Sequence, residues 1–180
     1  MDLYLIRHGI AAPWETWIGR RDADRPLIPK GVSRVECIAR GLQSLGVRFD
    51  RIVTSPYVRA RQTADILSDV QAGGRPEIDE SLAFGDCAAL IESLGDDGAQ
   101  CIALVGHEPD LSDLISVLVT GEHGSRFRMK KGGVARLSID APRYGRCASL
   151  EWLMAPKAFL CFADASSDQT LVEAAAGEQA

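Results

Sequence analysis

The sequence predicts an α/β fold, a three-layer α/β/α sandwich with a mainly parallel central sheet and a late antiparallel edge. Short apolar segments alternate with longer segments whose apolar residues recur at helical spacing, as in helices that cover both faces of a parallel sheet. The 180 residues, 46% hydrophobic and 25% charged, match one globular domain. We expect this single domain to span residues 1–162, and the small, polar and acidic residues 163–180 to form a frayed tail.

The first elements of the chain are predicted from three adjoining segments. Leu3–Ile6 is wholly apolar before a glycine turn, which predicts a strand buried on both faces. Residues 11–29 lack a clear period and are rich in Trp, Arg, Asp and Pro, so we expect an ordered surface loop. Residues 30–46 predict a core-facing helix that ends at Gly46, because apolar side chains recur at helical spacing at Val35, Ile38, Leu42 and Leu45.

A second strand and helix follow at the middle of the chain. Residues 51–54 predict a short buried strand. Ser55 is expected to cap the next helix and Pro56 to occupy its first position, with the helix running from Tyr57 to about Val70. The Gly-Gly-Arg-Pro break at residues 73–76 then precedes a weak strand at residues 77–78.

The second half repeats the alternation before the pattern changes. A short helix is expected near residues 90–95, and residues 101–105 are the clearest buried strand. Residues 111–118 carry leucines and isoleucine at helical spacing and predict a helix. Residues 134–139 and 150–154 predict two late strands, separated by an Arg/Gly turn, that form the antiparallel edge.

Composition excludes several classes of protein. A formal charge of -5 without a concentrated basic face argues against nucleic acid as a partner. No segment approaches the roughly 20 apolar residues of a membrane helix, and Arg and His come too early for a signal peptide, so we expect a cytoplasmic protein without membrane contact. Five cysteines without a CxxC pair indicate reduced, mostly buried thiols.

Neither a metal nor a cofactor is expected. Asp22 and Asp24 have no partnering His or carboxylate at ligand spacing, and they lie among arginines, so ion pairs with Arg20, Arg21 or Arg25 are the better interpretation.

The polar residues that suggest chemistry follow predicted strands. Arg7-His8-Gly9 follows the first strand, Arg59 lies in the first turn of the helix after the second, and His107 follows residues 101–105. The carboxyl ends of parallel strands form one edge of the sheet, where ligands bind in such folds. Two guanidinium groups can hold the oxygens of a phosphoryl group, and an unprotonated imidazole can attack its phosphorus. The pattern therefore predicts a phosphate pocket.

These residues resemble the histidine phosphatase superfamily, also called the phosphoglycerate mutase-like family. The similar segments, in chain order, are Leu5–Gly9, Ser55–Ala64 and Val105–Pro109. The resemblance covers residues 1 to about 154. It implies a phosphoglycerate mutase-like fold, phosphorylation of His8, phosphoryl binding by Arg7 and Arg59, with Gly9 in the same motif, and stabilisation of transition-state charge by His107.

Within that superfamily, the chain resembles the SixA type of phosphohistidine phosphatase. The short length, the Arg25-Pro26-Leu27 turn and the Gly-His-Glu-Pro segment carry this resemblance, which implies that Arg25 is a further phosphate ligand. Glu80, Asp86 and Glu108 are candidates for a proton donor, although none stands in a clear motif. An imidazole leaving group needs less protonation than an alkoxide, so the substrate is expected to be a protein phosphohistidine.

Other interpretations stay open at this point. The chain can instead be a phosphatase of small phosphate monoesters, or a non-catalytic module that binds phosphorylated partners. Trp14 and Trp17 can line the substrate entrance or attach the 11–29 loop to the core. Lys130-Lys131 can face an anionic ligand or form an exposed hairpin. His123 is expected to have no role, and a monomer is the default.

Overall fold

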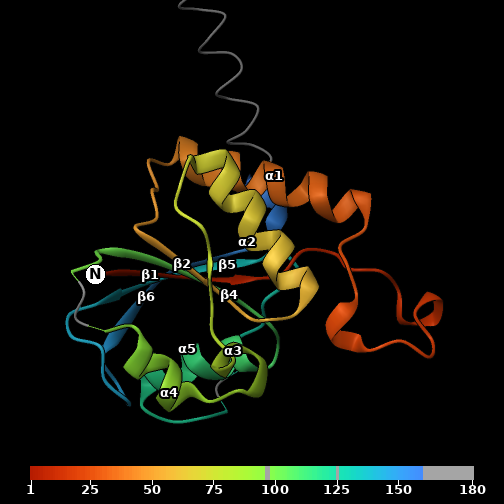
Figure 1. The fold of residues 1–180 in the computed structure, drawn as a ribbon. Coiled ribbons are helices and arrows are strands. Elements are labelled where there is room, and N and C mark those ends of the chain that lie inside the picture. Colours follow the sequence, from red (N-terminus) through yellow and green to blue (C-terminus); the bar gives the residue numbers. More distant parts are fainter. Residues whose placement is uncertain (96–97, 125, 160–180) are drawn as a thin grey trace, which may run out of the picture.

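The structure is a computed structural model that describes residues 1–95, 98–124 and 126–159. Figure 1 shows a central sheet with helices on both of its faces, which confirms the predicted α/β/α sandwich. The predicted tail, residues 163–180, lies outside the described residues.

The helices and strands follow each other in the predicted alternation. The strands are β1 (Asp2–Arg7), β2 (Arg51–Thr54), β3 (Glu77–Ile78), β4 (Cys101–Gly106), β5 (Val134–Ile139) and β6 (Ala148–Met154). The α-helices are α1 (Pro29–Ser44), α2 (Val58–Gln71), α3 (Ser81–Phe84), α4 (Cys87–Ser93) and α5 (Asp110–Thr120). Two 3₁₀ helices, η1 (Trp14–Thr16) and η2 (Asp22–Asp24), lie in the loop after β1.

The sheet is parallel in its centre and antiparallel at one edge. Its strand order is β3-β2-β4-β1-β5-β6, with β1, β2, β3 and β4 parallel. β5 pairs antiparallel with β1, and β6 pairs antiparallel with β5, as expected for the late strands. Three parallel strands, β2, β4 and β1, therefore end side by side at the centre of one edge.

Each face of the sheet buries its own apolar cluster. In β1, Leu3 and Leu5 pack with residues of α3, α4 and α5, whereas Tyr4 and Ile6 pack with residues of α1 and α2. This alternation follows from the two-residue period of a strand, which sends successive side chains to opposite faces. Burial on both faces fixes the strand and hence the position of the residues that follow it.

Several boundaries differ from those expected. Helix α2 begins at Val58 with Tyr57 as its N-cap, so the prediction that Ser55 caps it and Pro56 opens it was wrong. Helix α1 ends at Ser44, which leaves Leu45 41% exposed instead of buried in the core. Cys87 is buried, but Cys37, Cys101 and Cys147 are only half-buried, and Cys161 lies outside the described residues.

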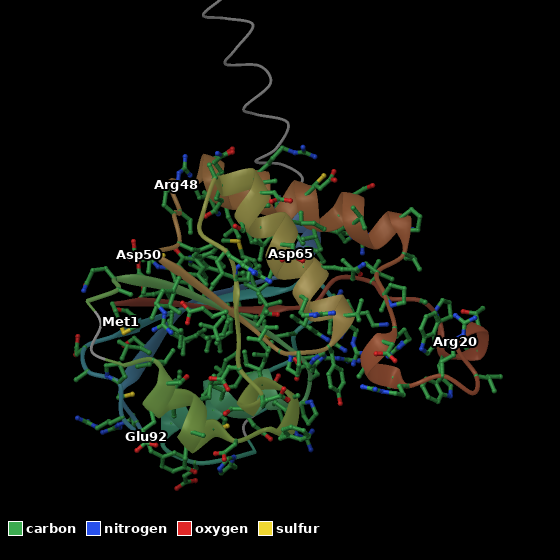
Figure 2. All side chains as sticks on the ribbon, in the orientation of Figure 1. Met1, Arg20, Arg48, Asp50, Asp65 and Glu92 are labelled. Carbon is green, nitrogen blue, oxygen red and sulfur yellow. The ribbon has the colours of Figure 1, made fainter. Side chains whose placement is uncertain are left out.

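The loop of residues 11–29 projects from the carboxyl edge of the sheet. Figure 1 shows this loop extending beyond β1, and Figure 2 places Arg20 at its tip, at the opposite end of the molecule from Met1. Ala11 pairs with Leu27 at the base of the loop, and both are buried. Neither 3₁₀ helix has a buried residue, and Trp14 is 53% exposed, so Trp14 does not attach the loop to the core.

No helix within the described residues is long and apolar enough to span a membrane.

Candidate active site

The site lies where three neighbouring strands end. The register pairs Arg7 of β1 with Gly106 of β4, and Thr54 of β2 with Val105 of β4. The next residue of each strand is His8, Ser55 and His107, respectively. The backbone ladder continues past the strand ends, because the His8 N–H donates to Gly106 O at 3.1 Å. The sheet therefore places these three side chains side by side.

The hydrogen bonds of His8 select one tautomer of its ring. Nδ1 lies 2.7 Å from the carbonyl oxygen of Gly9, and Nε2 lies 3.3 Å from Nε of Arg59. A carbonyl oxygen only accepts and a guanidinium N–H only donates. One neutral tautomer satisfies both contacts, with the proton on Nδ1 and the lone pair on Nε2. The His8 ring thus keeps an unprotonated nitrogen beside Arg59.

Burial holds His8 in this neutral form. Its side chain is only 5% exposed. Desolvation lowers its pKa from 6.5 to about 2, and the positive charges of Arg59 and Arg7 act in the same direction. Nε2 therefore carries its lone pair at neutral pH, which a nitrogen nucleophile requires.

Arg59 is held between His8 and the loop of residues 11–29. Its Nη2 lies 2.9 Å from Oδ2 of Asp22, and its Nη1 donates to the carbonyl oxygen of Asp22 at 2.9 Å. Burial lowers the pKa of Arg59, and the Asp22 carboxylate opposes that shift. Arg59 also lies over the Tyr57 ring, with Cζ 4.8 Å from the ring centroid. These contacts fix one guanidinium plane beside Nε2 of His8.

Arg7 occupies the other side of the site. Its Nη1 donates to the carbonyl oxygen of Met129 at 2.7 Å. Its Nε is buried without a hydrogen-bond partner in the described structure. Burial lowers the pKa of Arg7, whereas the nearby Glu108 carboxylate acts in the opposite direction. The guanidinium stays charged at neutral pH, because arginine keeps its proton in proteins.

Glu108 supports the backbone that Arg7 contacts. Its Oε1 accepts from the Met129 N–H at 2.9 Å and from the Ser112 hydroxyl at 2.8 Å. Of the three candidates for a proton donor, Glu108 is the one with a contact to a neighbour of Arg7, and its hydrogen bonds favour a positioning role.

His107 packs against His8 and is anchored by a hydroxyl. The two ring centroids are 5.0 Å apart, and Nε2 of His107 lies 2.8 Å from Oγ of Ser55. The Tyr57 ring lies on another side, with centroids 4.8 Å apart. Burial lowers the pKa of His107 to about 4. Its Nδ1 is buried and has no partner in the described structure, so it is open to a ligand.

Gly9 positions His8 and is too closely packed to carry a side chain. Its N–H donates to the Thr63 hydroxyl at 3.1 Å, and its carbonyl oxygen binds the His8 ring. A Cβ at Gly9 would lie 2.7 Å from a methyl carbon of Val35, a separation that real Cβ atoms essentially never show. Because the Gly9 N–H already donates to Thr63, it is not a free donor for a ligand in this structure.

The remaining predicted residues lie at the rim or outside. Arg25 binds Asp22 through Nη2 at 2.8 Å and the Ala12 carbonyl oxygen through Nη1 at 3.0 Å, so Asp22 connects it to Arg59. Asp86 is exposed and caps α4 by accepting from the Ala89 N–H at 3.0 Å, and Glu80 is exposed at the start of α3. His123 is exposed and bonds Tyr144, away from the site.

The described residues contain no group of three or more His, Cys, Asp or Glu side chains that could hold a metal ion. The charges that face His8 are instead the guanidinium groups of Arg7 and Arg59.

Comparisons of the sequence with known proteins identify a family and several relatives. A sequence model of the histidine phosphatase superfamily (branch 1) matches residues 3–90. An uncharacterised protein of Picosynechococcus is 39% identical over 147 residues, which cover 79% of this chain and 88% of that protein. The chain belongs to the histidine phosphatase superfamily. Phosphohistidine phosphatase SixA of Escherichia coli is 26% identical to this superfamily member over 161 residues, covering 87% of this chain and 94% of SixA.

The fold is shared with SixA as well. The structure of the protein histidine phosphatase SixA complexed with tungstate superposes on this superfamily member with a TM-score of 0.73 and 25% identity, covering 87% of this chain and 98% of SixA. The predicted superfamily and its SixA relatives are thereby confirmed, and a phosphatase activity follows at the level of the superfamily.

Three residues that were not predicted hold the predicted site residues in place. Asp22 was interpreted as an ordinary surface ion pair, yet it binds Arg59 as well as Arg25. Ser55 was expected to cap a helix, yet it anchors His107. No role was expected for Thr63, yet its hydroxyl accepts a hydrogen bond from the Gly9 N–H. A signal existed for Ser55, because it directly follows a buried strand as His8 and His107 do.

Proposed function

We propose that this chain is a metal-independent phosphatase that forms a covalent phosphohistidine on His8 and acts on protein phosphohistidine. The observation that carries the proposal is the tautomer of His8, whose Nε2 keeps a lone pair next to the Arg59 guanidinium. Burial keeps that nitrogen unprotonated at neutral pH. A nucleophile and a cation that binds its target thus lie within 3.3 Å of each other.

The reaction has two displacements at phosphorus. In the first, the Nε2 lone pair of His8 forms a P–N bond while the P–N bond to the substrate imidazole breaks, and that imidazole takes a proton from solvent. In the second, a water oxygen attacks phosphorus, the P–N bond to His8 breaks, and its electron pair returns to Nε2. Orthophosphate leaves, and Nδ1 keeps its proton throughout, donating it in a hydrogen bond to the Gly9 carbonyl oxygen.

Arg7 and Arg59 offset the charge on the transferred phosphoryl group, and His107 can donate a hydrogen bond to it. Among the described residues, buried side-chain atoms without a partner include Nε of Arg7 and Nδ1 of His107. Such atoms are costly to leave unpaired, because each has lost its water without gaining a partner. Phosphoryl oxygens between the two side chains would satisfy both, which supports a substrate-binding role for Arg7 and His107. Arg25 contributes positive charge at the rim, where Asp22 offsets it.

Among the described residues, none of the three carboxyl candidates contacts the His8 ring, which favours an N–P substrate. Asp86 caps a helix, Glu80 is exposed, and Glu108 accepts hydrogen bonds from the Ser112 hydroxyl and the Met129 N–H. An alkoxide leaving group needs a proton in the transition state, whereas an imidazole leaves with less help. The likeness to SixA, named a phosphohistidine phosphatase, supports the same substrate class. Free cysteines at Cys37, Cys87, Cys101 and Cys147 fit a reducing compartment, and we propose the cytoplasm.

The proposal is tested by phosphate release in EDTA. Wild type and His8→Ala are compared on a phosphohistidine-bearing phosphotransfer protein and on p-nitrophenyl phosphate. We expect release from phosphohistidine by wild type alone, with much slower hydrolysis of the ester. His123→Ala is the matched control, because His123 is exposed and lies away from the site, and it should retain wild-type activity.

Two outcomes would overturn parts of the proposal. Faster cleavage of the ester than of phosphohistidine would assign the chain to small phosphate monoesters and would require a carboxylic acid donor. No His8-dependent release from either substrate would leave a non-catalytic phosphate-binding module.

A further inference from the structure

A basic pocket adjoins the catalytic residues on the side of Arg7. Its volume is about 530 Å³, and four separate segments of the chain line it. Arg7 belongs both to this lining and to the group around His8. We define the basic pocket by its cationic lining, which comprises Arg7, Arg34, Arg128, Lys130, Lys131 and Lys157.

The charge of the basic pocket is not neutralised by its own lining. Apart from the six cations, the lining consists of Ile10, Met129, Ala155 and Pro156, so it includes no carboxylate. In the described part of the chain, none of the five cations other than Arg7 forms an ion pair. Glu108 lies near Arg7 and offsets only that end of the pocket.

Such a concentration of positive charge is unusual for this molecule. The whole chain carries a formal charge of -5, yet six like charges converge on one concavity. Like charges repel each other, and ion pairs with acidic neighbours would relieve that repulsion. Six cations without acidic partners in the pocket lining, beside the catalytic group, indicate a ligand that supplies the negative charge. Lys130-Lys131, which the sequence left open, lies in this lining.

We propose that the basic pocket is a second anion subsite, which binds a further anionic group of the substrate while His8 and the two arginines engage the phosphoryl group. Arg7 belongs to the pocket lining and also to the charged groups around His8, so the two anionic groups lie next to each other on the substrate. This inference rests on the proposed function. For a phosphoprotein, the further group is an acidic side chain near the phosphohistidine. A second phosphate of a small molecule has the same chemistry and is the other source.

Binding of inorganic anions tests the subsite without any turnover. Orthophosphate, pyrophosphate and tripolyphosphate are titrated as competitive inhibitors of the full chain. Orthophosphate fills the catalytic group alone, whereas the longer anions extend into the basic pocket. We expect the inhibition constant to fall from orthophosphate to tripolyphosphate. In Lys130→Gln/Lys157→Gln, the constant for tripolyphosphate should rise about fivefold, while that for orthophosphate stays unchanged.

Paired peptides identify the source of the anionic group. Each pair carries the same phosphohistidine with either Asp and Glu or Asn and Gln beside it. For an acidic protein segment, wild type should have about fivefold higher kcat/KM on the acidic peptide, through KM. The double variant should lose this preference, as should wild type in about 1 M salt, where charges are screened within about 3 Å. If tripolyphosphate inhibits more strongly than orthophosphate but neither peptide of a pair is preferred, the pocket binds a second phosphate of the substrate.

A matched double variant controls for the loss of two charges. Arg143→Gln/Arg146→Gln removes two exposed cations between β5 and β6, at the end of the sheet opposite His8. It should behave as wild type with every anion and peptide. Equal inhibition by all three anions, unaffected by the pocket variant, would overturn the subsite. That result would leave the proposed function intact, because orthophosphate would still compete at His8; failure of orthophosphate to compete would count against the proposed function itself.

Discussion

His8 and His107 are both buried site residues, and their burial makes the stability of the fold depend on pH. Their side chains are 5% and 8% exposed, and their pKa values are lowered from 6.5 to about 2 and about 4. Both rings regain a pKa near 6.5 when the chain unfolds. Below that pH the unfolded chain binds more protons than the folded one, so acid favours unfolding. The contribution to stability is complete above about pH 6.5 and is lost as the pH falls.

This linkage predicts that the free energy of unfolding falls as the pH falls, and that substitution of His8 makes the decrease smaller. Between about pH 7 and about pH 5, each ring should lower the free energy of unfolding by about 2 kcal/mol. In His8→Gln, the loss over this interval should therefore be about 2 kcal/mol smaller than in wild type. Urea unfolding at the two pH values measures it. The same pH dependence in both proteins would mean that His8 titrates normally in the folded state.

Asp22 does not contact His8, but we predict that its substitution lowers activity through Arg59. It pairs with Arg59, a contact worth more than an exposed ion pair because the Arg59 side chain is only 7% exposed. We expect Asp22→Asn to lower kcat/KM at least about tenfold, since Arg59 loses the charge that orients it. Asp24→Asn is the control, because among the described residues Asp24 forms its ion pair with exposed Arg21 and none with Arg59. Equal activity of the two variants would exclude a positioning role for Asp22.

At the scale of elements, the start of α1 is fixed by a close backbone contact. A Cβ at Gly31 would lie 2.1 Å from the carbonyl oxygen of Ile10, in the loop that follows His8. Alanine normally stabilises a helix relative to glycine by about 1 kcal/mol, but here the helix and the loop must separate. The two effects have opposite signs, and a contact this short with backbone decides between them.

Gly31→Ala should therefore destabilise the fold by about 2 kcal/mol. Gly74→Ala is the matched control, because no atom lies within 4 Å of a Cβ at Gly74. Urea unfolding of both variants measures the difference. A Gly31→Ala protein as stable as wild type would show that α1 is free to move away from the loop after His8.

Elements were predictable where one period dominates the sequence. The apolar runs at the centre of β1 and β4 correspond to strands buried on both faces, and their ends placed His8 and His107 correctly at one edge. Sequence alone could not show that Asp22 binds Arg59, because that contact joins the loop to a helix 37 residues later. The start of α2 was misplaced because Ser55 serves His107 instead of the helix end. Tertiary contacts decided these cases, and local preference did not.

At the scale of the whole molecule, we predict that residues 163–180 can be removed without loss of thermal stability. Among the described residues, the two apolar clusters on the faces of the sheet extend as far as Phe159, which is fully buried. If the domain spans residues 1–162, as the sequence predicts, a chain that ends at Phe162 should keep the thermal midpoint of the full chain within about one degree. Calorimetry measures the midpoint, and light scattering should give a monomer for both chains. A fall of several degrees would place residues 163–180 in the folded domain.

The proposed reaction requires a covalent bond between phosphorus and His8, and trapping that bond tests it most directly. Wild type is mixed with a phosphohistidine substrate, denatured in alkali within one turnover, and mapped by mass spectrometry and phosphorus NMR. We predict one phosphoryl group on Nε2 of His8, absent from His8→Ala. Phosphate release with no phosphoenzyme at any time, or a phosphoryl group on another residue, would contradict the account.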